Sequence, residues 1–220
     1  MTTISVVTCC YGIDYAEFIP RWWSGLLRLN RKPDEIILGI AEGDLTGLSK
    51  SIPEGVDAKV VVLPEGNNME KWDFAVNQAT SKWWAYMSID DEFLPEALDQ
   101  VDEADEAGAE LLVDSIIVRQ TGALEKGHWD TSSIATRLPI PGWSPMTIDL
   151  YKRTVDVSYK FGDWVLQINA AAIGAKVYHA NTKRMIWDAG LDRPTLSSRL
   201  QPDFQYHLNQ VYEYAKSKGF

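Results

Sequence analysis

The chain has 220 residues, enough for one compact domain with a single core, and its 45% hydrophobic and 24% charged residues exclude a disordered or fibrous protein. Its formal net charge of -10 disfavours non-specific nucleic-acid binding, because phosphate contacts are normally made by Lys and Arg. A small anionic ligand is compatible with this charge, since a metal ion or a few local cations can reverse the field inside one pocket.

The two cysteines and the first residues bear on the cellular location. Cys9 and Cys10 are adjacent in an apolar, strand-like run, so their side chains should point to opposite faces and a structural disulfide is not expected. The N-terminal residues lack the basic start and cleavage site of a signal peptide, and no apolar run reaches the roughly 18 residues that span a bilayer. These features predict a soluble, cytoplasmic protein.

Short apolar runs alternate with amphipathic segments in the first half of the chain. The apolar runs predict strands and the amphipathic segments predict helices: strands over 4–11, 35–41, 58–63 and 83–89, and helices over 16–29 and 69–80. Because the strands are almost continuously apolar, both faces of their sheet should be covered. The pattern predicts an α/β fold with a central, mainly parallel sheet flanked by helices.

The second half is less regular. Pro95 and the acidic helix formers after it predict a helix over 95–107, and an apolar run predicts a strand over 111–118. Residues 119–143 carry several Gly and Pro with little periodicity, and a loop of this length in a compact domain is often functional. Later segments predict a helix over 163–173, a short strand over 176–179 and a last helix over 204–216.

Acidic residues follow one of the predicted strands, at the sheet edge where ligands of open α/β folds gather. The run WWAYMSI has no charge and is followed at once by Asp90, Asp91 and Glu92. Like charges packed together need a cation or strong donors, and carboxylates beside a diphosphate suit Mg²⁺ or Mn²⁺. The alternative is that Asp90 or Asp91 only caps a helix that begins near Pro95. The acidic run alone leaves both interpretations open.

The stretch SIDDEFLPEAL resembles the metal motif of glycosyltransferase family 2, in which Asp-x-Asp-Asp ends a strand and Pro-x-x-Leu opens a helix. Asp90 and Asp91 match the last two carboxylates, and Pro95 and Leu98 match the proline and the leucine. Other segments resemble the family in the same order: ISVVTCCYG, PDEIILGIAEGD, AVNQATSKWWAYMS and FGDWVLQINAAAIGAKVYH.

This resemblance covers roughly residues 4–180 and implies a GT-A fold. The chain would be a single Rossmann-like domain over residues 1–220, with a nucleotide-sugar half at about 1–92 and an acceptor half at about 93–220. Three positions depart from the family pattern. Ser88 stands in place of the first aspartate of the metal motif, Gly162 in place of a glutamate, and Val76 in place of a common basic residue.

The resemblance also implies roles for individual residues. Asp90 and Asp91 would bind a divalent metal, Mn²⁺ or Mg²⁺, with His179 as a further ligand, although a lone His is more often structural. Asp163 would act as the general base, and the alternative is that it caps the helix that begins there. Contacts with the nucleotide sugar are implied for Thr8, Cys9, Cys10 through its backbone, Tyr11, Glu42, Asn67, Lys71 and Asp90.

Some of these assignments have competing interpretations. Glu42 could belong to a plain turn, and Lys71 could be a solvated helix residue. Trp129, Trp143 and Trp187 lie in predicted loops or at their edges, and they are candidates for an acceptor pocket. Three cations either close over the diphosphate or lie at the surface: Lys183, Arg184 and Arg193.

These features predict a metal-dependent, hexosyltransferase-like glycosyltransferase that moves a sugar from a nucleoside diphosphate to an acceptor hydroxyl by an inverting displacement. A UDP-sugar is the favoured donor and a GDP-sugar is the second choice. Protein, glycan, lipid and modified nucleobase all stay open as acceptors. Ser88 and Gly162 keep an alternative open, which is an inactive scaffold of GT-A type that binds sugar or a partner protein. A dinucleotide oxidoreductase is disfavoured because no G-x-G-x-x-G follows the first strand.

Overall fold

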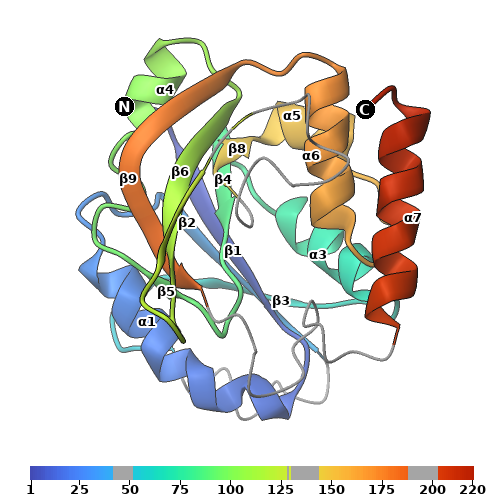
Figure 1. Cartoon of the computed structure of the whole chain (residues 1–220). Helices are drawn as coiled ribbons and strands as arrows, with labels where there is room; N and C mark the ends of the chain where they lie inside the picture. Colours follow the sequence, from blue (N-terminus) through green and yellow to red (C-terminus); the bar gives the residue numbers. More distant parts are fainter. Residues whose placement is uncertain (42–51, 128, 130–143, 188–202) are drawn as a thin grey trace.

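The computed structural model describes residues 1–41, 52–127, 129, 144–187 and 203–220. Its centre is one nine-stranded sheet in the order β3-β2-β1-β4-β8-β6-β9-β5, with β7 paired to β6 (Figure 1). The strands are β1 (Ile4–Cys10), β2 (Glu35–Ile40), β3 (Lys59–Val62), β4 (Trp83–Tyr86), β5 (Glu92–Phe93), β6 (Leu111–Val118), β7 (Leu124–Lys126), β8 (Met146–Thr147) and β9 (Val177–Trp187).

The sheet is parallel in its first half and mixed in its second, so the expectation of a mainly parallel sheet holds only for the first half. Strands β1 to β4 pair in parallel, whereas β5, β7 and β8 are short strands that pair antiparallel with their neighbours. The physical reason for β7 is its short connection to β6, because a parallel return needs a crossover of a dozen or more residues. Because β8 is antiparallel to both β4 and β6, these two strands run in the same direction, and β9 is parallel to β6. One edge of the sheet therefore holds the carboxyl ends of β1, β2, β3, β4, β6 and β9.

Helices cover both faces of this sheet (Figure 1). One face carries η1 (Ile13–Phe18), α1 (Ile19–Arg28) and α4 (Val101–Glu106), and the other carries α3 (Asn68–Val76), α5 (Ile148–Thr154) and α6 (Gly162–Ala172), with α7 (Phe204–Ser217) packed on α6. Strand β1 is buried along its whole length because its side chains alternate between the two layers. Cys10 thus packs in the α1 layer and Cys9 in the α3 layer, as their adjacency predicted.

Three predicted elements differ from the observed ones. The amphipathic segment 16–29 divides into η1 and α1, since Pro20 occupies the first turn of α1 and has no N–H to continue an earlier helix. The helix predicted from Pro95 begins at Val101 instead, after a succession of turns closed by i to i+3 hydrogen bonds. The strand predicted over 176–179 extends to Trp187, because β9 pairs with β6 and then with β5.

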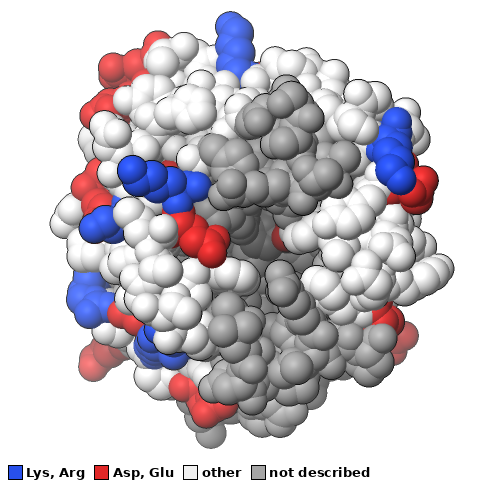
Figure 2. Space-filling model, in the orientation of Figure 1, with Lys and Arg blue, Asp and Glu red and all other residues white. Residues whose placement is uncertain are grey.

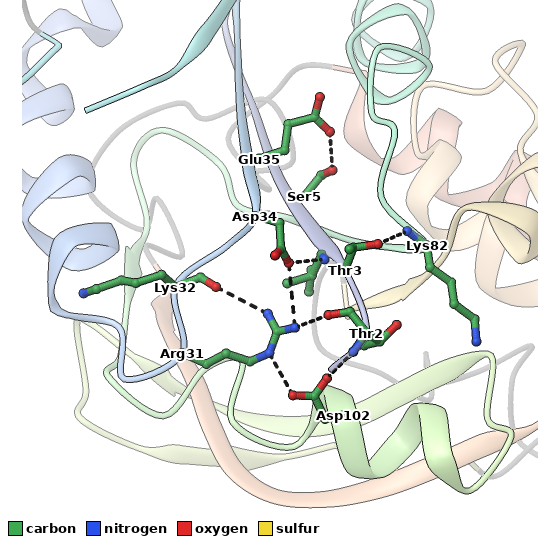
Figure 3. Close-up of polar contacts among 10 residues, drawn as sticks. Thr2, Thr3, Ser5, Arg31, Lys32, Asp34, Glu35, Lys82 and Asp102 are labelled. Atoms are coloured by element: carbon green, nitrogen blue, oxygen red, sulfur yellow. Dashed lines mark hydrogen bonds and ion pairs between the residues drawn. The ribbon is translucent and has the colours of Figure 1, made fainter. Parts of the chain in front are cut away.

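Arg31 joins three elements at the sheet edge opposite the carboxyl ends (Figure 3). Its guanidinium donates to the Thr2 carbonyl oxygen at 2.6 Å and to Asp102 Oδ2 at 3.3 Å, and it lies 3.8 Å from Asp34. Asp102 in turn accepts the Thr2 N–H at 2.7 Å, and Asp34 accepts the Ile4 N–H at 2.9 Å. The Arg31 side chain is only 8% exposed, so its hydrogen bonds tie the start of β1 to α4 with little competition from water.

Replacing this guanidinium should destabilise the fold. We expect Arg31→Met to lower the free energy of unfolding by about 1.5–3 kcal/mol, the usual contribution of hydrogen bonds to a charged group. Burial raises the pKa of Asp102, but hydrogen bonds from Arg31 and Thr2 outweigh this and hold the pKa below its usual value. The deficit of the variant should therefore shrink as the pH falls through that lowered pKa and Asp102 is protonated.

Denaturant unfolding at several pH values measures the Arg31 effect. Arg153→Met is the matched control, because Arg153 is 42% exposed and its ion pairs should contribute no more than about 1 kcal/mol. Equal losses in the two variants would contradict a special role for Arg31.

Charges of both signs are mixed on the described surface. On the face shown in Figure 2, Lys and Arg side chains of the described residues are interspersed with Asp and Glu and form no basic stripe. Among the described helices, none combines the length and apolar character needed to cross a membrane.

Candidate functional site

The Asp90–Asp91 pair lies in a turn shortly after β4, which ends at Tyr86. Asp90 is 6% exposed and Asp91 is 4% exposed, and the Asp91 N–H donates to the Ser88 carbonyl oxygen at 3.0 Å. The helix that follows, α4, starts ten residues later at Val101 with Gln100 as its N-cap. The interpretation of Asp90 or Asp91 as a helix cap is therefore wrong. Helix capping does not explain why these two carboxylates are buried near the carboxyl end of β4.

Arginine side chains lie around this turn and donate hydrogen bonds either to a backbone carbonyl oxygen or to the carboxylate of Glu92. Arg21 of α1 donates to the carbonyl oxygen of Asp90. Glu92 lies between two guanidiniums, with Arg28 and Arg119 both hydrogen-bonded to its carboxylate. Burial raises the pKa of Glu92, but these two hydrogen bonds outweigh it and hold the pKa below its usual value. Glu92 is thus engaged in ion pairs with both guanidiniums.

The end of β1 lies beside this turn, because β1 and β4 are adjacent parallel strands. Cys9 interacts with the Tyr11 hydroxyl and with Lys71, and burial raises the pKa of its thiol to about 12. Tyr86, the last residue of β4, interacts with Cys9 and Tyr11 and also with the charges of Asp90 and Asp91, and burial raises its pKa well above the usual value. Through Tyr86, the side chains of Cys9 and Tyr11 thus lie within electrostatic range of the acidic turn.

Three of the predicted donor residues are buried. Thr8 and Cys10 have no exposed surface and Cys9 is 1% exposed, so their side chains are core groups and only their backbone could face a ligand. The Cys10 thiol donates to the Gly12 carbonyl oxygen at 3.4 Å. Glu42 lies outside the described residues.

Asn67 serves as the N-cap of α3. Its Oδ1 accepts the N–H groups of Met69 and Glu70 at 2.8 and 3.0 Å, and the Glu70 carboxylate accepts the Asn67 N–H in return. Its Nδ2 donates to the Val157 carbonyl oxygen at 3.2 Å. Asn67 therefore connects the start of α3 to the segment around Val157, which precedes α6.

Asp163 lies in the first turn of α6, close to the start of α3. The N-cap position of α6 is Phe161, and the Asp163 carboxylate one position into the helix accepts the backbone N–H groups of Asp163 and Trp164. A Cβ on Gly162 would lie 2.4 Å from Met69 Cε, which shows how closely the two helix starts pack and why no larger side chain fits there unless Met69 moves. Burial raises the pKa of Asp163 to about 6, while hydrogen bonds from backbone N–H groups partly oppose this. A carboxylate with this pKa is ionised at neutral pH and is well suited to accept a proton.

The structure does not bring His179 to the acidic turn. Glu92 and Phe93 pair with Ile186 and Met185 of β9, and His179 lies six residues before Met185, roughly 20 Å along the strand. His179 is also exposed and lies opposite Val113. No cluster of three or more His, Cys, Asp or Glu suited to a metal ion occurs among the described residues.

The remaining aromatic and basic candidates divide between core and surface. Trp129 and Trp187 are partly buried and pack against the core on opposite layers, Lys183 is exposed, and Trp143 and Arg193 lie outside the described residues. Arg184 is fully buried, so the expectation that it lies over the diphosphate or at the surface is wrong. Its guanidinium interacts with Asp114 and with Asp91.

Sequence reasoning missed Asp114 altogether and assigned Arg184 to the wrong place. Asp114 is the only charge in the apolar strand LLVDSIIV, and a single charge in a buried strand requires a partner, so this signal was available. Tyr86 was missed because it is one of several aromatic residues in a strand predicted to be core.

The sequence matches neither a protein-family model nor a curated protein. Solved structures with the same fold were found at low sequence identity. A structure of S. aureus TarS over its residues 1–349 superposes with a TM-score of 0.70 and 14% identity, covering 97% of this chain and 65% of that one. The same protein in complex with UDP-GlcNAc gives a TM-score of 0.71 at 14% identity, with 97% and 66% covered.

A third structure is the mannosyltransferase PcManGT from Pyrobaculum calidifontis in complex with GDP-Man and Mn²⁺. It superposes with a TM-score of 0.70 and 12% identity, covering 100% of this chain and 65% of that one. The chain thus spans less than two thirds of the length of these structures. At these identities the similarity establishes a shared mixed α/β fold, the one predicted from the motif order.

Proposed function

We propose that this chain is a metal-dependent glycosyltransferase of GT-A type that takes a sugar from a nucleoside diphosphate. The observation that carries the proposal is the buried Asp90–Asp91 turn at the carboxyl end of β4, within a fold whose solved examples hold UDP-GlcNAc or GDP-Man. A UDP-sugar is the favoured donor, with a GDP-sugar second. Tyr11 and Lys71 would line the donor side, with Cys9 facing it through its backbone, and the acceptor is a hydroxyl group of a molecule still to be identified.

Asp90 and Asp91 fit a divalent cation that completes its coordination with phosphate and water. Mg²⁺ and Mn²⁺ prefer oxygen ligands, and in phosphate-binding sites one or two carboxylates commonly suffice. A cation bound there would neutralise the charge that develops on the leaving diphosphate. Support comes from the Mn²⁺ in the mannosyltransferase structure. His179 is not included in this proposal, because it lies too far along β9.

Asp163 is the proposed general base. It would accept the proton of the acceptor hydroxyl while that oxygen attacks the anomeric carbon from the face opposite the diphosphate, so that the configuration inverts. Its place at the first turn of α6, beside the start of α3, and its pKa of about 6 support this role.

The proposal predicts that UDP raises the melting temperature only when Mn²⁺ is present, and that Asp91→Asn abolishes this increase. The measurement is thermal unfolding with UDP or GDP and Mn²⁺ or EDTA, followed by nucleotide release from UDP- and GDP-sugars. Asp99→Asn is the control, because Asp99 is an exposed carboxylate in the same segment. Nucleotide binding without any turnover would instead support the inactive scaffold that Ser88 suggests. No nucleotide binding under any condition would reject both.

A further inference from the structure

Helix α7 packs on α6 and on the segment before it, at the outside of the molecule (Figure 1). The two helices share an apolar cluster that, within the described residues, contains no residue of a strand. Its buried members are Phe161, Val165, Ile168, Val211 and Ala215. Tyr214 of α7 also donates its hydroxyl hydrogen to Asn169 Oδ1 of α6, at an O–O distance of 2.7 Å. The packing of α7 therefore acts on α6 and its lead-in segment rather than on the sheet.

The start of α7 lies against the residues just before Asp163. Phe161, two residues before Asp163, is 5% exposed. Its ring centroid lies 5.5 Å from that of Phe204 and 6.1 Å from that of His207, both in edge-to-face arrangements. Aromatic rings at these separations attract each other in this geometry. Phe204 and His207 thus fix the ring of Phe161.

A charged contact joins the same two segments. The Lys160 ammonium donates to Asp203 Oδ1 at 2.7 Å, and Asp203 Oδ2 lies 2.8 Å from His207 Nε2. Asp203 is the N-cap residue of α7, where an aspartate usually accepts backbone N–H groups of its own helix. Its side chain makes no such bond. The carboxylate is directed instead at Lys160, three residues before Asp163.

The first turn of α6 is held by both α3 and α7. Its N-cap residue, Phe161, has no side-chain oxygen that could cap the helix. From α3, Met69 packs so closely that a Cβ on Gly162 would lie 2.4 Å from Met69 Cε. From α7, Phe204 packs against Phe161. The position of Asp163 is therefore set by two helices that are distant from it in sequence.

We propose that Phe204 and Asp203 are positioning residues that hold the first turn of α6, and with it the Asp163 carboxylate, in place for proton transfer. The inference rests on the proposed function, in which Asp163 is the general base. Both residues act through the segment before α6, Phe204 through Phe161 and Asp203 through Lys160.

Stability alone does not explain the direction of the Asp203 carboxylate. The Lys160 and Asp203 side chains are 28% and 46% exposed, and ion pairs exposed to this degree contribute little to folding. Placement of a catalytic group, by contrast, is sensitive to small displacements, and a shift of about 1 Å can lower the rate by about 10²-fold. Contacts that fix orientation are therefore expected beside a general base.

Turnover tests the inference. The probe is hydrolysis of UDP-GlcNAc or GDP-Man in the presence of Mn²⁺, with water as the acceptor whose proton Asp163 takes. We expect Phe204→Ala to lower the turnover number by about 10²-fold and to leave nucleotide affinity unchanged, because the proposed donor contacts lie on β1, α3 and the acidic turn. Phe204→Tyr keeps the ring and should restore most of the rate. In the Asp163→Asn background, Phe204→Ala should cause little further loss, because residues that act as a unit are not additive.

Phe220→Ala is the matched control. Phe220 belongs to the same apolar cluster but lies beyond the other end of α7, roughly 20 Å along the helix from Phe204. Its replacement should leave turnover unchanged even where it lowers the melting temperature. Asp203→Asn retains the apolar cluster and should also lower turnover, so it provides a second test if Phe204→Ala does not fold. Its control is Glu213→Gln, because Glu213 pairs with Lys216 in the last turns of α7.

Titration of Asp163 by carbon NMR gives a readout that does not depend on turnover. Burial raises the pKa of Asp163 from 3.8 to about 6, so a loosened first turn that admits water should lower the pKa toward 3.8. We expect this decrease in Phe204→Ala and not in Phe220→Ala. The resonance is assigned by its absence in Asp163→Asn.

Three results would overturn the inference: turnover of Phe204→Ala equal to that of Phe220→Ala, an equally large loss when Phe204→Ala is added to Asp163→Asn, or an unchanged Asp163 pKa in Phe204→Ala. If the wild-type chain hydrolyses neither donor, the proposed function fails, and the titration alone decides whether α7 places the Asp163 carboxylate. If the wild-type chain is active and Phe204→Ala is equally active, the proposed function stands without the positioning role.

Discussion

Asp163→Asn should lower the turnover number by about 10²- to 10⁴-fold, the usual contribution of a general base. The amide cannot accept the acceptor proton, but it keeps the shape and polarity of the first turn of α6. Donor binding should be unchanged, because the proposed donor contacts lie on β1, α3 and the acidic turn. Nucleotide release in the presence of an acceptor and UDP binding by calorimetry measure the two quantities separately.

The pH dependence gives a second measure of the same residue. Activity of the wild-type chain should rise as the pH increases through about 6, where Asp163 loses its proton. The residual activity of Asp163→Asn should lack this step. A step that persists at the same pH in the variant would show that another group is the base.

The same substitution should stabilise the chain at pH 7.5. The pKa of Asp163 is raised from its usual 3.8 to about 6 in the folded state, so the folded chain binds more protons than the unfolded chain between these values. Stability from this group is therefore lost as the pH rises through that window, and Asn avoids the loss. Asp114, whose pKa is shifted in the same direction, is present in both proteins and cancels in the comparison.

A lower melting temperature of Asp163→Asn at pH 7.5 would contradict this account of its pKa. Asp149→Asn is the matched control for activity and stability, because Asp149 occupies the first turn of α5 and its side chain is 82% exposed. It should leave both nearly unchanged.

Arg184→Met should cost about 3–5 kcal/mol of unfolding free energy, the usual effect of removing one partner of a buried ion pair. The variant leaves the Asp114 carboxylate buried without the guanidinium that lies 3.6 Å from it, and it also removes the electrostatic interaction of Arg184 with Asp91. In a chain of this size each kcal/mol lowers the melting temperature by about 2–4 °C, so a decrease on the order of 10 °C is expected. Thermal unfolding measures it.

Two further variants separate burial from charge in this result. Lys183→Met removes the neighbouring exposed cation of β9 and should change stability by no more than about 0.5 kcal/mol. Adding Asp114→Leu to Arg184→Met should recover most of the loss, since the unpaired buried carboxylate is removed. If Arg184→Met melted like Lys183→Met, or if the deficit at about pH 6 were no smaller than the deficit at a pH well above 6, Asp114 would not be the charge that Arg184 balances.

Much of the first half of the fold was predictable from local patterns. The apolar runs of β1, β2 and β3 and the uncharged WWAY of β4 identify their strands within three residues at each end, because strands buried on both faces exclude polar side chains. The position of Asp90 and Asp91 beyond the carboxyl end of β4 follows from chain order alone, since they come directly after the uncharged run WWAYMSI that begins with β4. The order of the motifs also predicted the fold shared with the glycosyltransferase-like solved structures.

Only the tertiary structure decided the second half. The antiparallel β8, the extension of β9 and the delayed start of α4 depend on pairing between segments far apart in the chain, which periodicity does not report. His179 and Arg184 show the consequence, because both follow the same helix, yet the register leaves His179 exposed while Arg184, at an irregularity in the pairing of β6 with β9, is buried. The sequence by itself thus determined which strand end carries the acidic pair, and strand register, a long-range property, decided which charges surround it.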